Sequence, residues 1–308
     1  MERILLAVSG GIDSMYLANT APSIWPEASF AVAHCNFHLR GQESDGDELF
    51  VREWCKAREW PCFVAGFDTR RYAAEKGVSI EMAARELRYS WFAEVMEKEG
   101  FDALAVAHNA CDNAETLFLN LLRGTGSKGV RGMNSTDRLR RPLLGTTRAE
   151  IRSRMESEGW AWREDSTNAE SDCKRNILRN RVFPILSEIN PSFIQTLGSD
   201  MAHLREVDDI AEDYWTDACG RIVREADGRI EVDVDGLLAL KHWKYVLWRL
   251  MENRSLSDKT FAKMTQLLER YATRPRGTVT LSGKRFESGE WTVRTVGKKL
   301  TIEKRVSE

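Results

Sequence analysis

Residues 9–14 (Ser-Gly-Gly-Ile-Asp-Ser) constrain the fold more than any other part of the sequence. They follow the apolar run at residues 4–8 and precede a helical pattern that starts near Met15. A strand, a small-residue turn and a helix in this order bring backbone N–H groups and the positive end of the helix dipole to one point, which suits an anion. Glycine lets the backbone approach that anion closely. The segment predicts a phosphate-binding loop, with a tight glycine turn that binds nothing as the alternative.

This loop differs from the usual P-loop, which is longer and ends in Lys-Ser/Thr. Residues 9–14 resemble instead the PP-loop of ATP pyrophosphatases, which bind the pyrophosphate end of ATP and release AMP. The resemblance implies that a substrate is adenylated and that the terminal phosphate is not transferred. The loop residues predicted to bind the nucleotide are Ser9, Gly10, Gly11, Ile12, Asp13 and Ser14.

Composition limits the classes of protein that fit this sequence. The chain has 308 residues, 42% hydrophobic and 30% charged, which is enough for one large domain and a smaller one. No apolar run approaches the roughly 20 residues that span a bilayer, so we expect no membrane contact. A predicted strand follows Met-Glu-Arg directly, so we expect no signal peptide and a cytoplasmic protein. The six cysteines have no Cys-x-x-Cys spacing, which disfavours a zinc or iron–sulfur site.

Charge is distributed unevenly along the chain, although the net charge is only -2. Residues 1–240 carry 29 Lys and Arg against 40 Asp and Glu, whereas residues 241–308 carry 16 against 7. Residues 123–181 are also basic, with 14 against 8. The two basic segments favour a polyanionic partner. Two solvated faces with ordinary variation in charge are the alternative.

Short apolar runs alternate with helical patterns in the first part of the chain, which predicts βαβ units and an α/β fold with helices on both faces of a parallel sheet. Ser79 and Gly100 are the expected caps of one of these helices. The predicted strands are residues 4–8, 30–33, 62–67 and 103–107, and the helices between them are residues 15–20, 45–59 and 79–99.

Polar segments follow three of these strands, at residues 9–14, 34–40 and 108–115. Ligands of such sheets bind at the carboxyl ends of the strands. We therefore expect the three segments to converge on one crevice.

The composition changes beyond about residue 215. Helical patterns cover residues 147–159 and 199–218, before this change. After it, residues 242–272 form a helical segment that contains tryptophan and lysine. Residues 276–305 alternate as a short β-meander, with strands expected at 278–281, 291–294 and 300–302. We predict a catalytic domain at residues 1–215, ending in a long linker helix, and a small α+β domain at residues 216–308.

Several motifs in order resemble the tRNA(Ile)-lysidine synthetase family across nearly the whole first domain. They are His-Cys-Asn-Phe-His-Leu-Arg at 34–40, Glu-Ser-Asp at 43–45, Ala-Arg-Glu-Leu-Arg-Tyr at 84–89, Ala-His-Asn-Ala-Cys-Asp-Asn-Ala-Glu-Thr at 107–116, Leu-Arg-Gly-Thr-Gly at 122–126, Arg-Pro-Leu-Leu at 141–144, Glu-Asp-Ser-Thr-Asn at 164–168 and Arg-Asn-Ile-Leu-Arg at 175–179.

The resemblance implies a five-stranded parallel sheet of the adenine nucleotide α-hydrolase type and an ATP-dependent ligase that forms a carbon–nitrogen bond. The family joins free L-lysine to C2 of the wobble cytidine in the CAU anticodon of tRNA(Ile), through an adenylated cytidine, and releases AMP and pyrophosphate. The product, lysidine, reads AUA as isoleucine instead of AUG as methionine. ATP and Mg²⁺ are the implied cofactors; whether the chain forms a homodimer is left open.

The resemblance also suggests roles for individual residues. Asp13 is either a Mg²⁺ ligand or a helix N-cap, and His34 is as readily structural as functional. Arg85 and Arg88 are either solvent-facing or part of the crevice. The predicted catalytic residues are Asp13, Arg88, His108, Asp112 and Glu115, the predicted metal ligands are Asp13 and Asp112, and Ala33 and His34 are predicted at the adenosine.

One position departs from the family pattern. The family usually has two adjacent aspartates after the histidine, and here the first is Cys111, so that only Asp112 remains. Asp112 and Glu115 are three residues apart on a helix predicted to start near Ala110, which places them on one face. They are suited to share an ion or an amine.

Basic residues of the middle segment are predicted to contact tRNA phosphates, and the second domain resembles the tRNA-recognition domain of the family. Trp248 is expected in its core. The predicted tRNA-binding residues are Arg123, Arg140, Arg141, Lys174, Arg175, Arg179 and Arg181, and Trp243, Lys241, Lys244, Lys259, Lys263 and Arg270 belong to the second domain. The rival interpretations are another PP-loop tRNA-modifying enzyme and a tRNA-binding relative without turnover.

Overall fold

The computed structural model describes residues 1–164, 174–226, 228–252, 254, 256–273, 281 and 283–305. The chain divides into two compact units, Met1–Arg205 and Glu206–Glu308. The division falls inside the long helix α10 (Phe193–Ile222), which also contains the boundary expected near residue 215. Among the described helices, none combines the length and the apolar character needed to cross a membrane.

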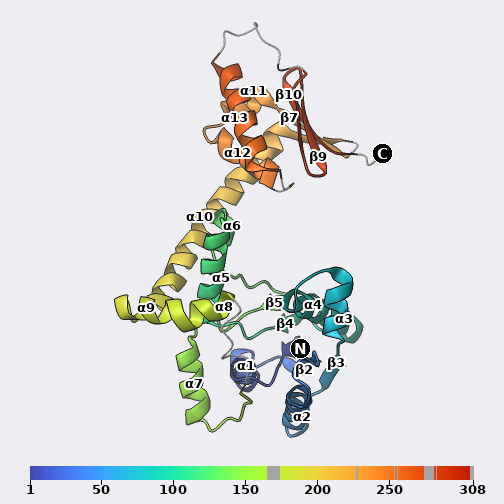
Figure 1. The fold of residues 1–308 in the computed structure, drawn as a ribbon, viewed down its shortest axis with the longest axis vertical. Helices are drawn as coiled ribbons and strands as arrows, with labels where there is room; N and C mark the ends of the chain where they lie inside the picture. The colour runs from blue at the N-terminus through green and yellow to red at the C-terminus, as the bar shows by residue number, and fades with distance from the viewer. Residues whose placement is uncertain are drawn as a thin grey trace. The chain divides into compact units, whose positions relative to one another are not determined.

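A parallel sheet forms the centre of the first unit (Figure 1). Within the described residues it has five strands in the order β3-β2-β1-β4-β5, all parallel, which confirms the predicted fold class. The fifth strand is only two residues long, and for that reason no apolar run in the sequence indicates it. The strands are β1 (Arg3–Ala7), β2 (Ser29–Asn36), β3 (Cys62–Gly66), β4 (Ala103–Ala105) and β5 (Leu139–Arg140).

Helices cover both faces of this sheet because successive residues of a strand point to opposite sides. Leu6 of β1 packs in a core with α1, α2 and α7, whereas its neighbour Leu5 packs in another core with α4. These helices are α1 (Ile12–Ile24), α2 (Gln42–Lys56), α4 (Ile80–Glu99) and α7 (Arg148–Ser157).

Capping residues fix the ends of several helices where the sequence indicates them. Ser79 accepts a hydrogen bond from the Met82 N–H and Gly100 adopts a left-handed conformation, so both predicted caps of α4 are confirmed. The first unit also contains α3 (Thr69–Lys76), α5 (Ala110–Arg123), α6 (Ser127–Val130), α8 (Lys174–Ile177), the π-helical turn η2 (Leu178–Val182) and α9 (Phe183–Ile189).

The second unit is an antiparallel sheet with helices. Its described strands are ordered β6-β7-β10-β9-β8. The expected strands at residues 291–294 and 300–302 are confirmed as parts of β9 and β10, while residues 278–280 lie outside the described residues. The elements are β6 (Val223–Ala226), β7 (Arg229–Asp233), α11 (Val234–Ala239), α12 (Trp243–Glu252), α13 (Asp258–Ala272), β8 (Arg285–Ser288), β9 (Trp291–Val296) and β10 (Lys299–Lys304).

One expectation for the core of the second unit is wrong. Trp248 was predicted to be buried, but it is half-buried and lies 5.9 Å, between ring centroids, from Tyr245. Its neighbour Arg249 is completely buried, pairs with Glu212 and lies against the ring of Trp215. Helical spacing alone could not distinguish these neighbours, because an arginine is seldom fully buried unless it is paired.

We expect Gly10→Ala to destabilise the first unit. The φ angle of Gly10 is +93°, which an alanine adopts only with strain. The expected loss is about 1–3 kcal/mol in the free energy of unfolding, measured by urea denaturation.

Gly11→Ala is the matched control. Gly11 has φ -74° and ψ 163°, and an added Cβ would only meet Ser9 Oγ at 3.5 Å. Equal losses in the two variants would show that backbone strain at Gly10 is not the cause.

Candidate active site

The loop at residues 9–14 lies between β1 and α1 and leaves the start of α1 without a side-chain cap. Ser14 Oγ accepts from the Ser9 N–H at 3.1 Å and donates to the Gly11 carbonyl at 2.9 Å, so the loop is held by its own side chains. The first N–H groups of a helix have no partner within it. This arrangement can bind an anion such as a phosphate.

Residues distant in the sequence hold the loop from outside. The Arg163 N–H donates to the Gly10 carbonyl at 3.0 Å, and the Arg163 guanidinium pairs with Asp47. Asp47 is buried and also pairs with Arg40, at 2.7 Å. The sequence analysis missed this support because no local pattern links three segments so far apart.

Asp13 is not the N-cap of α1, since Gly11 occupies that position. Its Oδ1 accepts from Asn109 Nδ2 at 3.0 Å, and its Oδ2 lies 3.5 Å from an Arg148 nitrogen. Burial raises the pKa of this carboxyl, and the Arg148 charge opposes that shift. Asp13 therefore faces the start of α5 and contributes nothing to the capping of α1.

Asn109 and Asp112 form a capping box at the start of α5. Asp112 Oδ2 accepts from the Asn109 N–H at 3.1 Å, which leaves Oδ1 turned toward Arg148 at 3.7 Å and Arg179 at 3.5 Å. The same nitrogen of Arg148 thus approaches both Asp13 and Asp112. The two carboxylates are close enough to share one cation.

This pair of carboxylates fits a magnesium ion that is also held by substrate phosphates. Mg²⁺ commonly binds one or two carboxylates and completes its shell with water and phosphate oxygens. Within the part of the chain that the structure describes, no group of three or more His, Cys, Asp or Glu side chains could hold a metal alone. Two carboxylates alone would hold such an ion weakly, and phosphate oxygens of a nucleotide would strengthen its binding.

Glu115 is the most buried acidic group of the site, with 0% exposure. Its Oε1 accepts from Arg179 at 2.9 Å and 2.6 Å. Its Oε2 has no hydrogen-bond partner among the residues that the structure describes, and it lies 3.9 Å from an Arg175 nitrogen. Burial raises its pKa, and the Arg179 charge opposes the shift. Arg179 contacts both Asp112 and Glu115, as their three-residue spacing predicts.

His108 is neutral in this environment. Arg141 Nε donates to His108 Nδ1 at 3.2 Å, so that nitrogen is an acceptor and the proton resides on Nε2. Burial lowers the pKa of the imidazole to about 4, with further lowering by Arg141 and an opposing effect of Asp112. The residue is suited to accept or donate a hydrogen bond without carrying charge.

Cys111 lies near the start of α7. Burial raises the pKa of its thiol, and the nearby backbone and charge of Arg148 oppose that shift. A protonated thiol is a poor ligand for Mg²⁺, which prefers oxygen. The carboxylate pair described above is formed without this position.

The end of β2 contributes few side chains to the site. The Ala33 carbonyl accepts a hydrogen bond from the Val8 N–H at 3.0 Å, and His34 is buried with Nδ1 donating to the Val8 carbonyl at 2.9 Å. Burial lowers the pKa of His34. These contacts give His34 a structural function beside the loop.

Arg88 of α4 lies over the ring of Phe37, 5.2 Å from its centroid, just beyond the end of β2. Arg85 lies over the ring of Tyr89 at 5.0 Å, and its charge contributes to the low pKa of His108. Both arginines therefore occupy the edge of the sheet where the polar segments were expected to converge.

The basic residues predicted to bind tRNA fall into three groups. Arg141, Arg175 and Arg179 contact His108 or Glu115 inside the site. Arg140 pairs with Glu2, which precedes β1 at the end of the strand opposite the loop. Arg123, Lys174 and Arg181 are exposed. Of the 164–168 motif, residues 165–168 lie outside the described residues.

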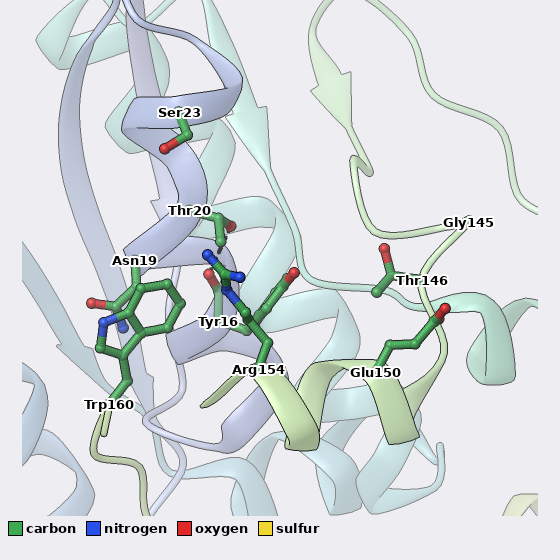
Figure 2. Close-up of a pocket in the computed structure, with 9 residues that line it drawn as sticks. All are labelled: Tyr16, Asn19, Thr20, Ser23, Gly145, Thr146, Glu150, Arg154 and Trp160. Atoms are coloured by element: carbon green, nitrogen blue, oxygen red, sulfur yellow. Dashed lines mark hydrogen bonds between the residues drawn. The ribbon is translucent and has the colours of Figure 1, made fainter. Parts of the chain in front are cut away.

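A cavity of about 540 Å³ opens between α1 and α7 (Figure 2). Both helices begin at the carboxylate pair, α1 with Asp13 in its first turn and α7 with Arg148. The cavity contains none of the predicted site residues. It is lined by Tyr16, Asn19, Thr20, Ser23, Gly145, Thr146, Glu150, Arg154 and Trp160.

Two functional contacts escaped the sequence analysis. Asn109 joins α5 to Asp13, and Arg148 joins α7 to both carboxylates. Asn109 precedes a helical pattern and could have been recognised as its N-cap. Arg148 lies in an ordinary amphipathic stretch, where nothing distinguishes it from Arg152 or Arg154.

Comparisons with known proteins identify the fold and the family of this chain. A family model described as a PP-loop domain matches residues 1–186. A solved U34-tRNA thiolase from Methanococcus maripaludis, with its [4Fe-4S] cluster, is 16% identical, with a TM-score of 0.54 over 67% of this chain and 72% of that one. At that identity the likeness shows a common fold alone.

Several curated relatives are named tRNA(Ile)-lysidine synthase. The Porphyromonas gingivalis protein is 46% identical over 63% of this chain and 43% of its own length, and the Parabacteroides distasonis protein is 39% identical over 85% and 60%. This chain thus spans less than two thirds of either relative. The Chlorobaculum tepidum protein is 35% identical over 89% of this chain and 85% of its own length. With that coverage, and a PP-loop match over more than half of the sequence, the chain belongs to the tRNA(Ile)-lysidine synthase family of PP-loop proteins.

Proposed function

We propose that this protein is an ATP-dependent ligase that joins L-lysine to C2 of the wobble cytidine in the CAU anticodon of tRNA(Ile). The observation that carries this proposal is the buried Glu115 oxygen without a hydrogen bond, beside Asp112 and next to a PP-loop. An amine that enters the site would find there a carboxylate oxygen that Arg175 approaches only to 3.9 Å. Relatives named for this reaction support the choice of substrates.

The loop at residues 9–14 would bind the pyrophosphate end of ATP through its backbone N–H groups. Asp13 and Asp112 would hold Mg²⁺, which supplies Lewis-acid polarisation of the phosphate oxygens when bound. The positive end of the α1 dipole adds to that stabilisation. Ala33 and His34 would lie beside the adenosine. His34 would act there indirectly, because its hydrogen bond to the Val8 carbonyl supports the loop.

In the first step, O2 of the cytidine forms a bond to the α-phosphorus of ATP, and pyrophosphate leaves. In the second, the ε-amine of lysine attacks C2 and AMP leaves with the former O2. The amine must be neutral to attack, and Glu115, whose pKa burial raises, would accept its proton. Arg179 would hold Glu115 in place.

The exposed residues Arg123, Lys174 and Arg181 are the proposed contacts to tRNA phosphates in the first unit. Such contacts add salt-dependent affinity without reading sequence. The basic segment at residues 241–308, with its 16 Lys and Arg, would bind the remainder of the tRNA. Arg141, Arg175 and Arg179 would instead position the catalytic groups.

The direct test incubates the protein with Mg²⁺, ATP, labelled lysine and a tRNA(Ile) transcript that carries CAU. A CAU-bearing methionine tRNA is the control. Label in the isoleucine tRNA alone, with an equal amount of AMP, is the expected result. Absence of label and of AMP, from folded protein that still binds tRNA, would favour the binding-only relative.

We expect Glu115→Gln to separate the two steps. Loss of the base should slow lysine incorporation by about 10²–10⁴-fold, while ATP-dependent pyrophosphate release continues. Quenched-flow assays that follow pyrophosphate and lysine-labelled tRNA separately would measure both.

Glu81→Gln is a suitable control, because Glu81 also lies near Arg175, at 3.8 Å, but is 70% exposed. Equal rates of lysine incorporation in Glu115→Gln and in the Glu81→Gln control would show that Glu115 is not the base.

We expect His108 to remain neutral throughout the working pH range. Its pKa is lowered from the ordinary 6.5 to about 4, so the ring should gain a proton only in acid. The Cε1–H signal of His108 should therefore stay constant between about pH 8 and about pH 5.5 in an NMR titration.

His108→Gln identifies the signal among those of the five histidines. A midpoint for His108 near 6.5 would contradict its assignment as a neutral hydrogen-bonding group.

A further inference from the structure

Arg148 is the first residue of α7, and its backbone is fixed beside the start of α5. Thr147 caps α7, with Glu150 Oε2 accepting from the Thr147 N–H at 2.7 Å. The Thr146 carbonyl accepts from the Ala110 N–H at 2.9 Å. The start of α7 is thereby held at the site, and the Arg148 side chain, 33% exposed, is the part that can change position.

The guanidinium faces, on each carboxylate, the oxygen that does not bind Asn109. Asp13 Oδ1 accepts a hydrogen bond from Asn109, and Asp13 Oδ2 lies 3.5 Å from Arg148. Asp112 Oδ2 accepts from the Asn109 backbone N–H, and Asp112 Oδ1 lies 3.7 Å from Arg148 and also close to Arg179. These are the same oxygens that a bound Mg²⁺ would need.

The guanidinium and a divalent cation cannot both occupy this position. Mg²⁺ requires oxygen ligands at about 2.0–2.1 Å, and arginine cannot lose its charge in proteins. A magnesium ion that arrives with ATP would therefore repel Arg148 from the carboxylates. The phosphates that arrive with it offer the guanidinium a new partner, because its planar fork matches phosphate oxygens.

We propose that Arg148 is an exchange cation: it neutralises Asp13 and Asp112 in the empty site and moves onto the phosphates when Mg·ATP binds. The inference rests on the proposed use of ATP. During adenylation the bond from the α-phosphorus to the bridging oxygen breaks as the bond to cytidine O2 forms, and the electron pair leaves with pyrophosphate. Arg148 at the phosphates stabilises that charge and is then a catalytic residue.

The test compares wild-type protein with Arg148→Ala in two binding measurements. Electron paramagnetic resonance measures Mn²⁺ binding in the absence of nucleotide, and equilibrium dialysis measures ATP binding in the presence of Mg²⁺. Arg148→Ala should bind Mn²⁺ at least about tenfold more tightly, because a competing charge is gone. It should bind ATP at least about tenfold more weakly, because a phosphate contact is lost.

Arg152→Ala is the matched control, since Arg152 is on the same helix, is about half exposed and pairs with Glu156 and Glu164 away from the carboxylates. It should change neither affinity. Thermal unfolding of all variants shows whether each is folded, and Arg148→Lys, which keeps the charge, should restore the weaker Mn²⁺ binding.

Opposite changes in the two affinities support the exchange, since a merely structural arginine would not produce them. Unchanged Mn²⁺ affinity in folded Arg148→Ala would overturn the proposal, and so would unchanged ATP affinity. Neither measurement uses tRNA or lysine. Failure of the exchange is therefore distinguishable from failure of lysidine formation.

Discussion

The hydrogen bond from Asn109 Nδ2 to Asp13 Oδ1, 3.0 Å long, is the contact on which the organisation of the site depends. It joins the starts of α1 and α5, which follow neighbouring strands β1 and β4 of the parallel sheet. Two helix N-termini, each with a positive end of its dipole, are thereby directed at one point. Carboxylates are tolerated there, and an incoming polyphosphate finds the same positive potential.

Arginines from later elements complete this charge balance. Arg148 comes from α7, and Arg179 comes from the π-helical turn η2, a type of irregularity that is frequent at functional sites. Part of the positive charge of residues 123–181 is therefore used inside the protein, against Asp13, Asp112 and Glu115. A basic segment in a sequence cannot be assigned to an external polyanion before its internal partners are known.

The sequence predicted the sheet well because buried parallel strands read as continuous apolar runs, and predicted the capped ends of α4 because Ser79 and Gly100 have strong local preferences. It failed where the determinant is tertiary. The two-residue strand β5 has no pattern of its own. Trp248 was expected in the core and is only half-buried, whereas its neighbour Arg249 is fully buried. Arg148 meets Asp112 only because α7 begins beside the start of α5.

Cys111 illustrates how a site can lose a carboxylate and keep its electrostatics. Cys111 lies near the start of α7, where the backbone and charge of Arg148 oppose the rise in the thiol pKa that burial causes. The carboxylates that meet in the site, Asp13 and Asp112, are held by Asn109 and Arg148 without it. A neutral thiol at this position also removes one negative charge that the arginines would otherwise have to balance. The contacts of Asp13 and Asp112 with Asn109 and Arg148 are therefore formed without the aspartate that is usual at this position.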